Sequence, residues 1–584
     1  MHLMMPATVN KMYTEMIELS YNGQFFDLSP ETRINLEINN PIFDDELVNG
    51  SFSFPFLLPL TAATRRILNM PDIVENILPF PRTLKGVNLI VDGIPLFKGD
   101  LVIRRVTESS VDTFFLTGNS SLHEFATKTK VIDQLSYTRS FDTSEEVGAH
   151  MLEAAQGNVD TFPYVFFPVG APDFFGGTEP LLTSLRTIQN FYLLPGFKVS
   201  ERLEATSAAA QSYQYIAVTP FPYFTYILRE CLKGIDVKYN IFDHDTKLRT
   251  LVMYNNFGLS RYVKEYHLGI EYWVNKNDRS IDIRNHIPPE LTVADVIIGL
   301  KSVFCLFCYV SLKDGSLEYG AFSELLNRPT ELNWTSMADS SFEISNDFER
   351  GVKYVPDMKS DGAAQKFLQS IKGRRVLPWS AAPFPAVPGD ETLYHEPVFG
   401  EYWISSGNTI LYERFSKDYT DYYWEEAEYE VKFRMAPLIG DNITVWTDGV
   451  DPGLTIYQLA PIVMLRGRQY DREGKLNDSA SAPRITFFNG WALDNKGNPY
   501  PWGSSTTLAW EGASGLRNTW WKSYLDMRKF GKKVIRQIRL SLTDLAELDL
   551  LKKVRVENSN YLVKKINIEL PIRSPAKVEL WKVE

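Results

Sequence analysis

Residues 49–71 read NGSFSFPFLLPLTAATRRILNMP, and this stretch decides how the first part of the chain is expected to fold. Phe52, Phe54 and Phe56 alternate with serine and proline, which predicts a strand with one aromatic face. The pattern becomes helical at Thr61. The two prolines of the strand favour an edge position. With no catalytic residue type nearby, the aromatic face is expected to serve packing.

The composition of the whole chain favours a mainly β fold with interspersed short helices. Its 584 residues exceed what one hydrophobic core holds, so a multidomain chain is expected. The 44% hydrophobic and 23% charged residues indicate a globular protein. Aromatic residues make up 13%, and 35 Gly and 33 Pro supply turns, which tilts the expectation toward strands.

The net charge and the number of cysteines limit which partners and which cellular compartment can be expected. A net charge of −11 argues against a large nucleic-acid-binding surface, which needs clustered Lys and Arg, but suits a surface along which DNA passes without sticking. The three cysteines make no disulfide framework, which indicates synthesis in a reducing compartment. No signal-peptide pattern and no run near the ~18 apolar residues of a membrane span is found. We therefore expect synthesis in the cytoplasm and no membrane span.

Local patterns place hairpins and helices along the chain. Residues 87–106 read VNLIVDGIPLFKGDLVIRRV, which predicts a tight turn at Asp92-Gly93 and a turn or bulge at Lys98-Gly99. A helix-then-strand unit is expected at residues 222–256. A second begins at Thr292, which forms a capping-box-like start with an acidic residue three positions later.

These patterns divide the chain into four expected ranges. They are a strand-rich N-terminal barrel or sandwich at 1–150, middle helix-plus-strand domains at 151–345, an irregular β- and loop-rich insertion at 346–510 with a Pro-rich linker at 376–397, and a C-terminal helix and β-meander at 511–584.

Metal and thiol chemistry finds little support in the sequence. His244, between two aspartates, is the best metal candidate, but an isolated turn histidine is the expected reading. Cys305 and Cys308 have CxxC spacing without a second pair or a neighbouring His, so buried structural thiols are expected. No cofactor-binding motif is present, and we expect neither a metal nor a cofactor.

Two further clusters are candidates for glycan chemistry. The carboxylates Glu425, Glu426, Glu428 and Glu430 could suggest a glycosidase pair, but their near-alternate spacing is typical of the solvated face of a strand. Tryptophans gather between residues 491 and 521 and could form an aromatic interface or a sugar-stacking platform. These tryptophans are Trp491, Trp502, Trp510, Trp520 and Trp521.

Five stretches of the chain carry a resemblance to a known family. They are FDDELVNGSFSFPFLLPLTAATRRIL (43–68), VTPFPYFTYILRECLKGIDVKYNIF (218–242), PPELTVADVIIGLKSVFCLFCYVSLKDGSLEYG (288–320), LAWEGASGLRNTWWKSYLDMRK (508–529) and LTDLAELDLLKKVRVENSNYLVKKINIEL (542–570). Together they resemble the tail hub, or baseplate-hub-like, structural proteins of tailed phages and prophages of Bacteroidota.

The resemblance implies tail-tube-like β-barrel domains, two per chain, with inserted decorating domains between them. The first barrel would come from the N-terminal range, and the C-terminal meander would complete the second. Three chains would then present six barrels to a hexameric tube. Phe52, Phe54 and Phe56 would pack in a barrel core or against the next subunit.

The implied function is that of a virion structural protein at the tail tip or baseplate, without enzymatic activity. It would form an oligomeric hub ring, a trimer or else a hexamer. The ring would join the tail to receptor-binding parts, contact other tail and baseplate proteins and fibres, and let viral DNA pass through its lumen. The alternatives are a glycan-binding receptor-recognition protein of the tail, suggested by the tryptophans, and a polysaccharide depolymerase, suggested by the carboxylates.

Overall fold

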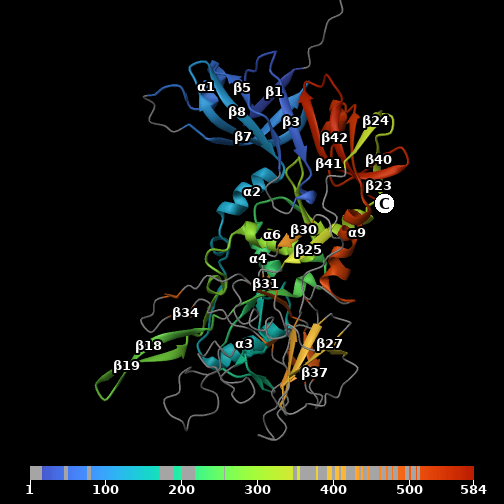
Figure 1. Ribbon diagram of the computed structural model, residues 1–584. Coiled ribbons are helices and arrows are strands. Elements are labelled where there is room, and N and C mark those ends of the chain that lie inside the picture. The colour runs from blue at the N-terminus through green and yellow to red at the C-terminus, as the bar shows by residue number, and fades with distance from the viewer. Residues whose placement is uncertain are drawn as a thin grey trace, which may run out of the picture.

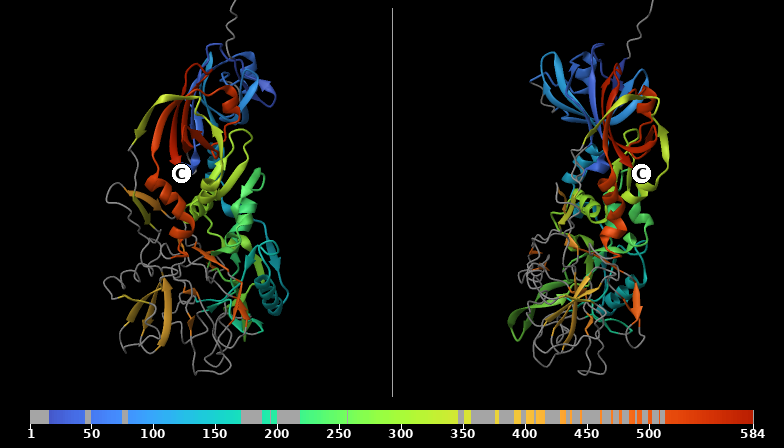
Figure 2. Two further views of the ribbon diagram at one scale, coloured as in Figure 1. Left: turned by 90° about the vertical axis from the view of Figure 1, so that its right-hand side faces the viewer. Right: turned by 45° about the vertical axis from the view of Figure 1, so that its right-hand side comes forward.

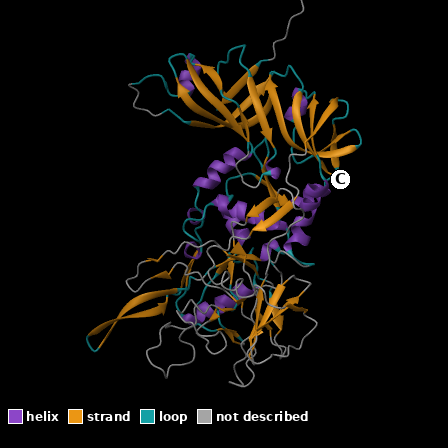
Figure 3. Cartoon of the chain, viewed as in Figure 1, coloured by secondary structure: helices purple, strands orange, loops and turns teal. Residues whose placement is uncertain are grey.

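The computed structural model describes residues 16–170, 188–199, 218–345 and 513–583, apart from short gaps, together with separate strands between residues 351 and 501. The described part is elongated, with most long strands gathered at one end and helices beneath them (Figures 1 and 3). The turned views of Figure 2 show the same order along the long axis. Among the described helices, none is long and apolar enough to cross a membrane.

The N-terminal unit, blue in Figure 1, contains eight described strands. The hairpin predicted at Asp92-Gly93 is confirmed, because both turn residues have positive φ, 51° and 75°. The strands are β1 (Ile17–Tyr21), β2 (Gln24–Phe25), β3 (Ile34–Asn39), β4 (Ser51–Ser53), β5 (Phe56–Pro59), β6 (Thr83–Val91), β7 (Ile94–Val106) and β8 (Ser110–Thr117).

The turn expected at Lys98-Gly99 is wrong, because β7 runs through it as one strand, but the register of β6 and β7 does shift beside Gly99, between the pairs Val87↔Gly99 and Leu84↔Leu101. The glycine has a different purpose. A Cβ atom on Gly99 would lie 2.0 Å from the carbonyl oxygen of Leu116, so only glycine lets β8 approach this closely.

The C-terminal unit, mainly red in Figure 1, combines strands from two distant parts of the sequence. The meander predicted near the C-terminus is confirmed as four strands, to which two strands from the middle of the chain are added. The six are β23 (Thr330–Asn333), β24 (Ala338–Ser345), β39 (Lys533–Ile538), β40 (Lys553–Val556), β41 (Ser559–Leu570) and β42 (Ala576–Val583).

The two units share one large curled, mostly antiparallel sheet. Strand β3 of the N-terminal unit pairs with β41 of the C-terminal unit from Ile34↔Leu570 to Asn39↔Lys565. The main order is β2-β1-β6-β7-β8-β4-β3-β41-β42-β39-β24, with β5 beside β8, β40 beside β41, and β23 beside β40. The buried side chains of β3 alternate, as expected for a strand with one face on a core.

Helices lie beneath the large sheet (Figure 1), and buried polar contacts join one of them to a small separate sheet. The side chain of Asn119, the first residue of α2 (Asn119–Lys128), donates to the carbonyl oxygen of Cys308 at 2.8 Å and accepts from the amide of Val310 at 2.7 Å. The capping box predicted at Thr292 is confirmed at the start of α6 (Val293–Phe304). The C-terminal helix is confirmed as α9 (Lys522–Phe530).

Small sheets extend the molecule away from the large sheet, and the remaining helices lie partly against that sheet and partly beyond it (Figure 1). The other helices are α1 (Ala62–Ile67), α3 (Ser144–Gln156), α4 (Phe224–Cys231), α5 (Ile241–His244), α7 (Phe322–Asn327) and α10 (Leu542–Ala546). The small sheets include β17 (Leu251–Tyr254), β18 (Ser260–His267), β19 (Ile270–Asn277), β21 (Leu306–Val310), β22 (Leu317–Ala321), β36 (Arg484–Phe487) and β37 (Trp491–Leu493).

The expectation of a β-rich, multidomain chain with short helices is confirmed. The four domain ranges stay predictions, although strand pairing crosses them, since β23 and β24 precede residue 346 and yet join the C-terminal strands. Most of the range 346–510 lies outside the described residues. Of the expected linker at 376–397, the structure describes β26 (Val376–Pro378) and β27 (Glu391–Glu396).

Candidate assembly surface

Strand β4 turns its serines, not its phenylalanines, toward the core. Ser51 and Ser53 are buried, whereas Phe52 is half-buried. The Ser51 hydroxyl accepts from the amide of Asn39 at 3.2 Å, and the Ser53 hydroxyl accepts from the amide of Phe115 at 2.8 Å. Small polar residues therefore fill the inner side of β4 and satisfy backbone donors of its two neighbours.

The chain changes face between β4 and β5. The prolines and the break in the ladder at Phe54-Pro55 separate the two strands, so that Phe56 is buried while Phe54 is 49% exposed. The expected single face for all three phenylalanines is wrong for this reason. Their predicted role in core or subunit packing stays a prediction, now divided between Phe56 inside and Phe52 and Phe54 outside.

Phe52 and Phe54 belong to an apolar stripe on the outer face of the N-terminal unit. Their ring centroids lie 5.9 Å apart in an edge-on arrangement. Phe52 is paired with Leu116 of β8, and Phe114 of β8 with Val102 of β7, so these side chains share one face. Leu57 of β5 is also exposed. We name this set the outer apolar stripe; its members are Phe52, Phe54, Leu57, Val102, Phe114 and Leu116.

The opposite end of the sheet is the edge strand β24, whose register with β39 shifts between Ala338 and Phe342. Within the described chain β24 has β39 as its only partner strand. Its sequence ADSSFEIS contains neither Lys nor Pro, the residues that commonly block edge pairing. Phe342 and Ile344 are exposed on it, and the Arg536 guanidinium lies 4.9 Å from the Phe342 ring centroid. An exposed edge with apolar side chains is a site for strand addition by another chain.

The tryptophans are distributed over different contacts. Trp491 of β37 donates through its indole N–H to the carbonyl oxygen of Ala155 at 3.0 Å. Trp520 packs against Phe304 with ring centroids 5.2 Å apart, and the Trp521 indole N–H donates to the carbonyl oxygen of Val303 at 3.1 Å. Trp502 and Trp510 lie outside the described residues. The three described indoles are thus used in internal packing against two separate helices.

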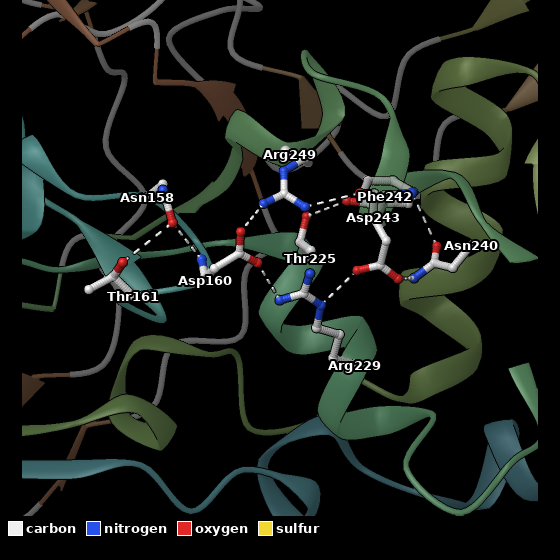
Figure 4. A network of polar contacts seen from close by, with 9 residues as sticks. All are labelled: Asn158, Asp160, Thr161, Thr225, Arg229, Asn240, Phe242, Asp243 and Arg249. Atoms are coloured by element: carbon white, nitrogen blue, oxygen red, sulfur yellow. Dashed lines mark hydrogen bonds and ion pairs between the residues drawn. The ribbon is translucent and has the colours of Figure 1, made fainter.

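The residues around His244 are engaged in a polar network (Figure 4). Asp243 accepts from the Arg229 Nε at 2.6 Å and from the Asn240 side chain at 3.1 Å. Asp245 accepts from the amides of Lys247 and Leu248 at 2.9 and 2.8 Å. The His244 ring stacks on Tyr239 with centroids 5.1 Å apart. Within the described residues no group of three or more His, Cys, Asp or Glu side chains is arranged to hold a metal ion.

The same network links the loop after α3 to α4 and to the segment after α5. Asp160 accepts from the Arg229 Nη1 at 3.0 Å and from the Arg249 Nη2, and the Arg249 Nη1 donates to the carbonyl oxygen of Asp243 at 3.0 Å (Figure 4). The hydrogen bond from Arg229, with further support from Arg249, lowers the pKa of the Asp160 carboxyl. Carboxylates neutralised in this way act as cross-links between elements rather than as proton acceptors.

The CxxC pair is buried, as expected. Cys305 and Cys308 are buried in the core and belong to no disulfide, and burial raises the pKa of Cys308 to about 12. The glycosidase candidates Glu425 and Glu426 lie outside the described residues. Glu428 and Glu430 belong to β30 (Glu428–Lys432), of which the structure describes the backbone.

Comparisons with known proteins give distant structural likenesses. No family model and no curated protein matches the sequence. Among solved structures, the chain is similar to the 43 kDa tail protein of prophage MuSo2 from Shewanella oneidensis, with a TM-score of 0.32 and 8% identity over 98% of each chain. It is also similar to the tail protein from Neisseria meningitidis MC58, with a TM-score of 0.31 and 10% identity over 98% of this chain and 97% of that one.

Proposed function

We propose that the chain is a structural protein of a phage tail that assembles with copies of itself into a hub ring at the tail tip or baseplate. The ring connects the tail to receptor-binding parts and lets DNA pass through its lumen. The protein acts by assembly and not by catalysis. The class of protein proposed here comes from the five sequence stretches that resemble tail hub proteins.

The observation that carries the proposal is the pairing of β3 with β41. It sets two β-units side by side in one sheet within a single chain. Three copies of such a chain offer six β-units, the number needed to meet a hexameric tube. A closed ring of this kind follows from cyclic symmetry with one repeated contact.

Two surfaces supply contacts for assembly. The outer apolar stripe exposes Phe54 and Leu57, and the edge strand β24 exposes Phe342 and Ile344. Apolar surface of this kind is typical of obligate interfaces, which bury more than about 2,000 Å² and resemble a domain core cut in half.

The charge of the chain agrees with passage of DNA. The net charge of −11 opposes tight binding of phosphate, so DNA moves along the ring without being held. In this proposal the DNA passes through the lumen without its base sequence being recognised.

The test is the mass of the purified full-length protein, measured by light scattering behind a sizing column at several concentrations. We expect a trimer, or else a hexamer, whose mass does not change on moderate dilution. A monomer at every concentration, up to the highest that stays soluble, would contradict assembly by the chain alone.

A further inference from the structure

A lysine and an asparagine face each other where β3 meets β41. The register of the two strands pairs Asn39 directly with Lys565. The amide of Asn40 donates to the carbonyl oxygen of Lys564 at 2.9 Å, which makes Asn39 and Lys565 a non-hydrogen-bonded pair. In such a pair the Cα atoms are about 4.5 Å apart, and the side chains lie closer than at the alternate positions of the ladder. The amine of one residue is therefore held within reach of the carboxamide of the other.

Glu37 connects these two groups. Its Oε2 atom is 2.7 Å from the Nζ atom of Lys565, and its Oε1 atom accepts from the Nδ2 atom of Asn39 at 3.2 Å. Residues 37 and 39 are two positions apart on one strand, so their side chains share a face of the sheet. One carboxylate thus contacts both the amine of the lysine and the amide nitrogen of the asparagine.

The three side chains are held in a half-buried position. The Lys565 side chain is 27% exposed and the Glu37 side chain is 17% exposed. On the next strand the half-buried Phe52 is paired with Glu37. Glu579, which faces Lys565 from β42, lies 3.2 Å from the Nζ atom of Lys533. The contact of Lys565 with Glu37 is therefore more restricted in geometry than an ion pair in open solvent.

We propose that Asn39 and Lys565 form an intramolecular isopeptide bond and that Glu37 transfers the protons. The Nζ atom of Lys565 gives a proton to Glu37 and then attacks the side-chain carbonyl carbon of Asn39. The bond from this carbon to Nδ2 breaks, Nδ2 takes up the proton from Glu37, and ammonia leaves. Nζ loses a second proton to the carboxylate, which passes it to the departing ammonia.

The proposed reaction is balanced without any further reactant. A lysine ammonium group and a carboxamide become a secondary amide and an ammonium ion, so neither an oxidant nor a cofactor is consumed. Lysine attacks only as the free amine, and the distance of 2.7 Å between Nζ and Oε2 suits removal of its proton. Groups held together in the right geometry react as if at roughly 10⁵ to 10⁸ M. Because strand pairing supplies this proximity, the bond forms after the chain has folded.

The position of the bond gives it a purpose in this fold. It would connect the N-terminal and C-terminal β-units at the strand pair that joins them. A covalent link between residues so distant in sequence strongly limits the unfolded chain and thereby stabilises the folded one. An amide link also does not depend on the redox state of the compartment, as a disulfide does. Both groups belong to one chain, so the inference stands apart from the proposed ring.

The test is the mass of the purified full-length protein, measured by mass spectrometry under denaturing conditions after the folded protein has been incubated. We expect a mass about 17 Da below that calculated from its sequence, which corresponds to the loss of one ammonia. A protease digest should contain a branched peptide that joins the segment around Asn39 to the segment around Lys565.

Three variants assign the role of each group. Lys565→Arg keeps the positive charge but provides no free amine, and Asn39→Ala removes the carbon that is attacked, so each should have its full calculated mass. Glu37→Gln leaves the amine and the carboxamide in place and removes the proton acceptor. It should therefore also stay unlinked, which a purely structural role of Glu37 would not require.

A matched control is available on the next strand. Lys577 of β42 faces Asn567 of β41 on the same side of the sheet, and within the described part of the chain it forms no ion pair with a carboxylate. Lys577→Arg should therefore leave the loss of ammonia and the branched peptide unchanged.

Two outcomes would overturn the inference. One is a parent protein with its full calculated mass and no branched peptide in its digest. The other is a loss of ammonia that persists in Lys565→Arg, because it would come from cyclisation of an asparagine elsewhere in the chain. Neither result bears on the proposed ring, which is tested by the mass of the assembled protein.

Discussion

At the residue scale, His150 is the buried ionisable group with the clearest consequence. It lies on α3, and its Nε2 atom is 2.9 Å from the Tyr164 hydroxyl. Its Nδ1 atom is 3.5 Å from the Glu153 carboxylate. The aromatic rings of Phe141, Phe162, Tyr164 and Phe166 surround the imidazole. Burial, reinforced by the positive charge of Arg139, lowers the pKa of His150 from 6.5 to about 4.

This lowered pKa predicts a loss of stability on acidification. Below pH 6.5 the unfolded chain binds a proton at His150, whereas the folded chain does so only near pH 4. The free energy of unfolding is therefore fully retained above pH 6.5 and falls toward pH 4, with a slope approaching about 1.4 kcal/mol per pH unit. Chemical denaturation at pH 7, 6 and 5 should show a shallower fall for His150→Gln than for the parent. Equal slopes would contradict the assignment.

The burial of a single residue could be predicted where its neighbours in the sequence decide its environment. Cys305 and Cys308 follow an apolar helix and enter an apolar strand, and their burial could be read from those neighbours. The tryptophans could not be placed in this way. Trp491 and Trp521 are 30 positions apart, yet one contacts the end of α3 and the other the end of α6, and only tertiary packing decides which helix each meets.

At the element scale, strands and caps could be predicted but not the orientation of a strand. The alternation around Phe52 correctly indicates a strand, and the change to a helical pattern at Thr61 is confirmed, since α1 begins at the next residue. Which set of alternate residues faces the core depends on the space between β4 and its neighbours. On the inner side of β4 the Ser51 and Ser53 hydroxyls accept hydrogen bonds from the backbone amides of Asn39 and Phe115, which a phenylalanine ring cannot do.

The opposite environments of Phe54 and Phe56 predict opposite effects of truncation. Phe56→Ala removes a buried ring and should lower the free energy of unfolding by about 3–5 kcal/mol. Phe54→Ala removes an exposed ring and should change it by less than about 0.5 kcal/mol, while weakening self-association through the outer apolar stripe. Denaturant unfolding of the dissociated protein measures the first effect, and light scattering measures the second. A large loss of stability for Phe54→Ala would place that ring in the core.

At the scale of the whole molecule, local sequence patterns predict single hairpins and meanders, but they do not predict how distant strands pair. The hairpin at Asp92-Gly93 and the C-terminal meander depend on neighbouring residues and could be recognised. The pairing of Ile34 with Leu570 joins residues at opposite ends of the chain, and no local sequence pattern predicts it. The same holds for β24, which pairs with β39 across the whole of the insertion. The pairing of β3 with β41 also sets Asn39 opposite Lys565, so the proposed cross-link could not be predicted from the sequence.

Asn40 forms hydrogen bonds across the junction of the two β-units. Its side-chain amide donates to the carbonyl oxygens of Leu550 and Val563, each at 2.8 Å, and its backbone amide donates to the carbonyl oxygen of Lys564 at 2.9 Å. The side-chain oxygen accepts from the amide of Ile42 at 3.2 Å. One buried side chain thus satisfies backbone groups of both units, next to a register shift between β41 and β42.

Removing this side chain should weaken the whole β-layer, because Asn40→Ala leaves two buried carbonyl oxygens without their donor. We expect a loss of about 1–3 kcal/mol in the free energy of unfolding. Asn39→Ala is the matched control, since among the described residues the Asn39 side chain hydrogen-bonds only to Glu37 of its own strand, and in a Lys565→Arg background, which cannot form the cross-link, the change should cost less than about 0.5 kcal/mol. Hydrogen exchange should accelerate in β3 and β41 together in Asn40→Ala. If exchange accelerates in β3 alone, the two units unfold independently, and a hub that depends on their shared sheet loses its basis.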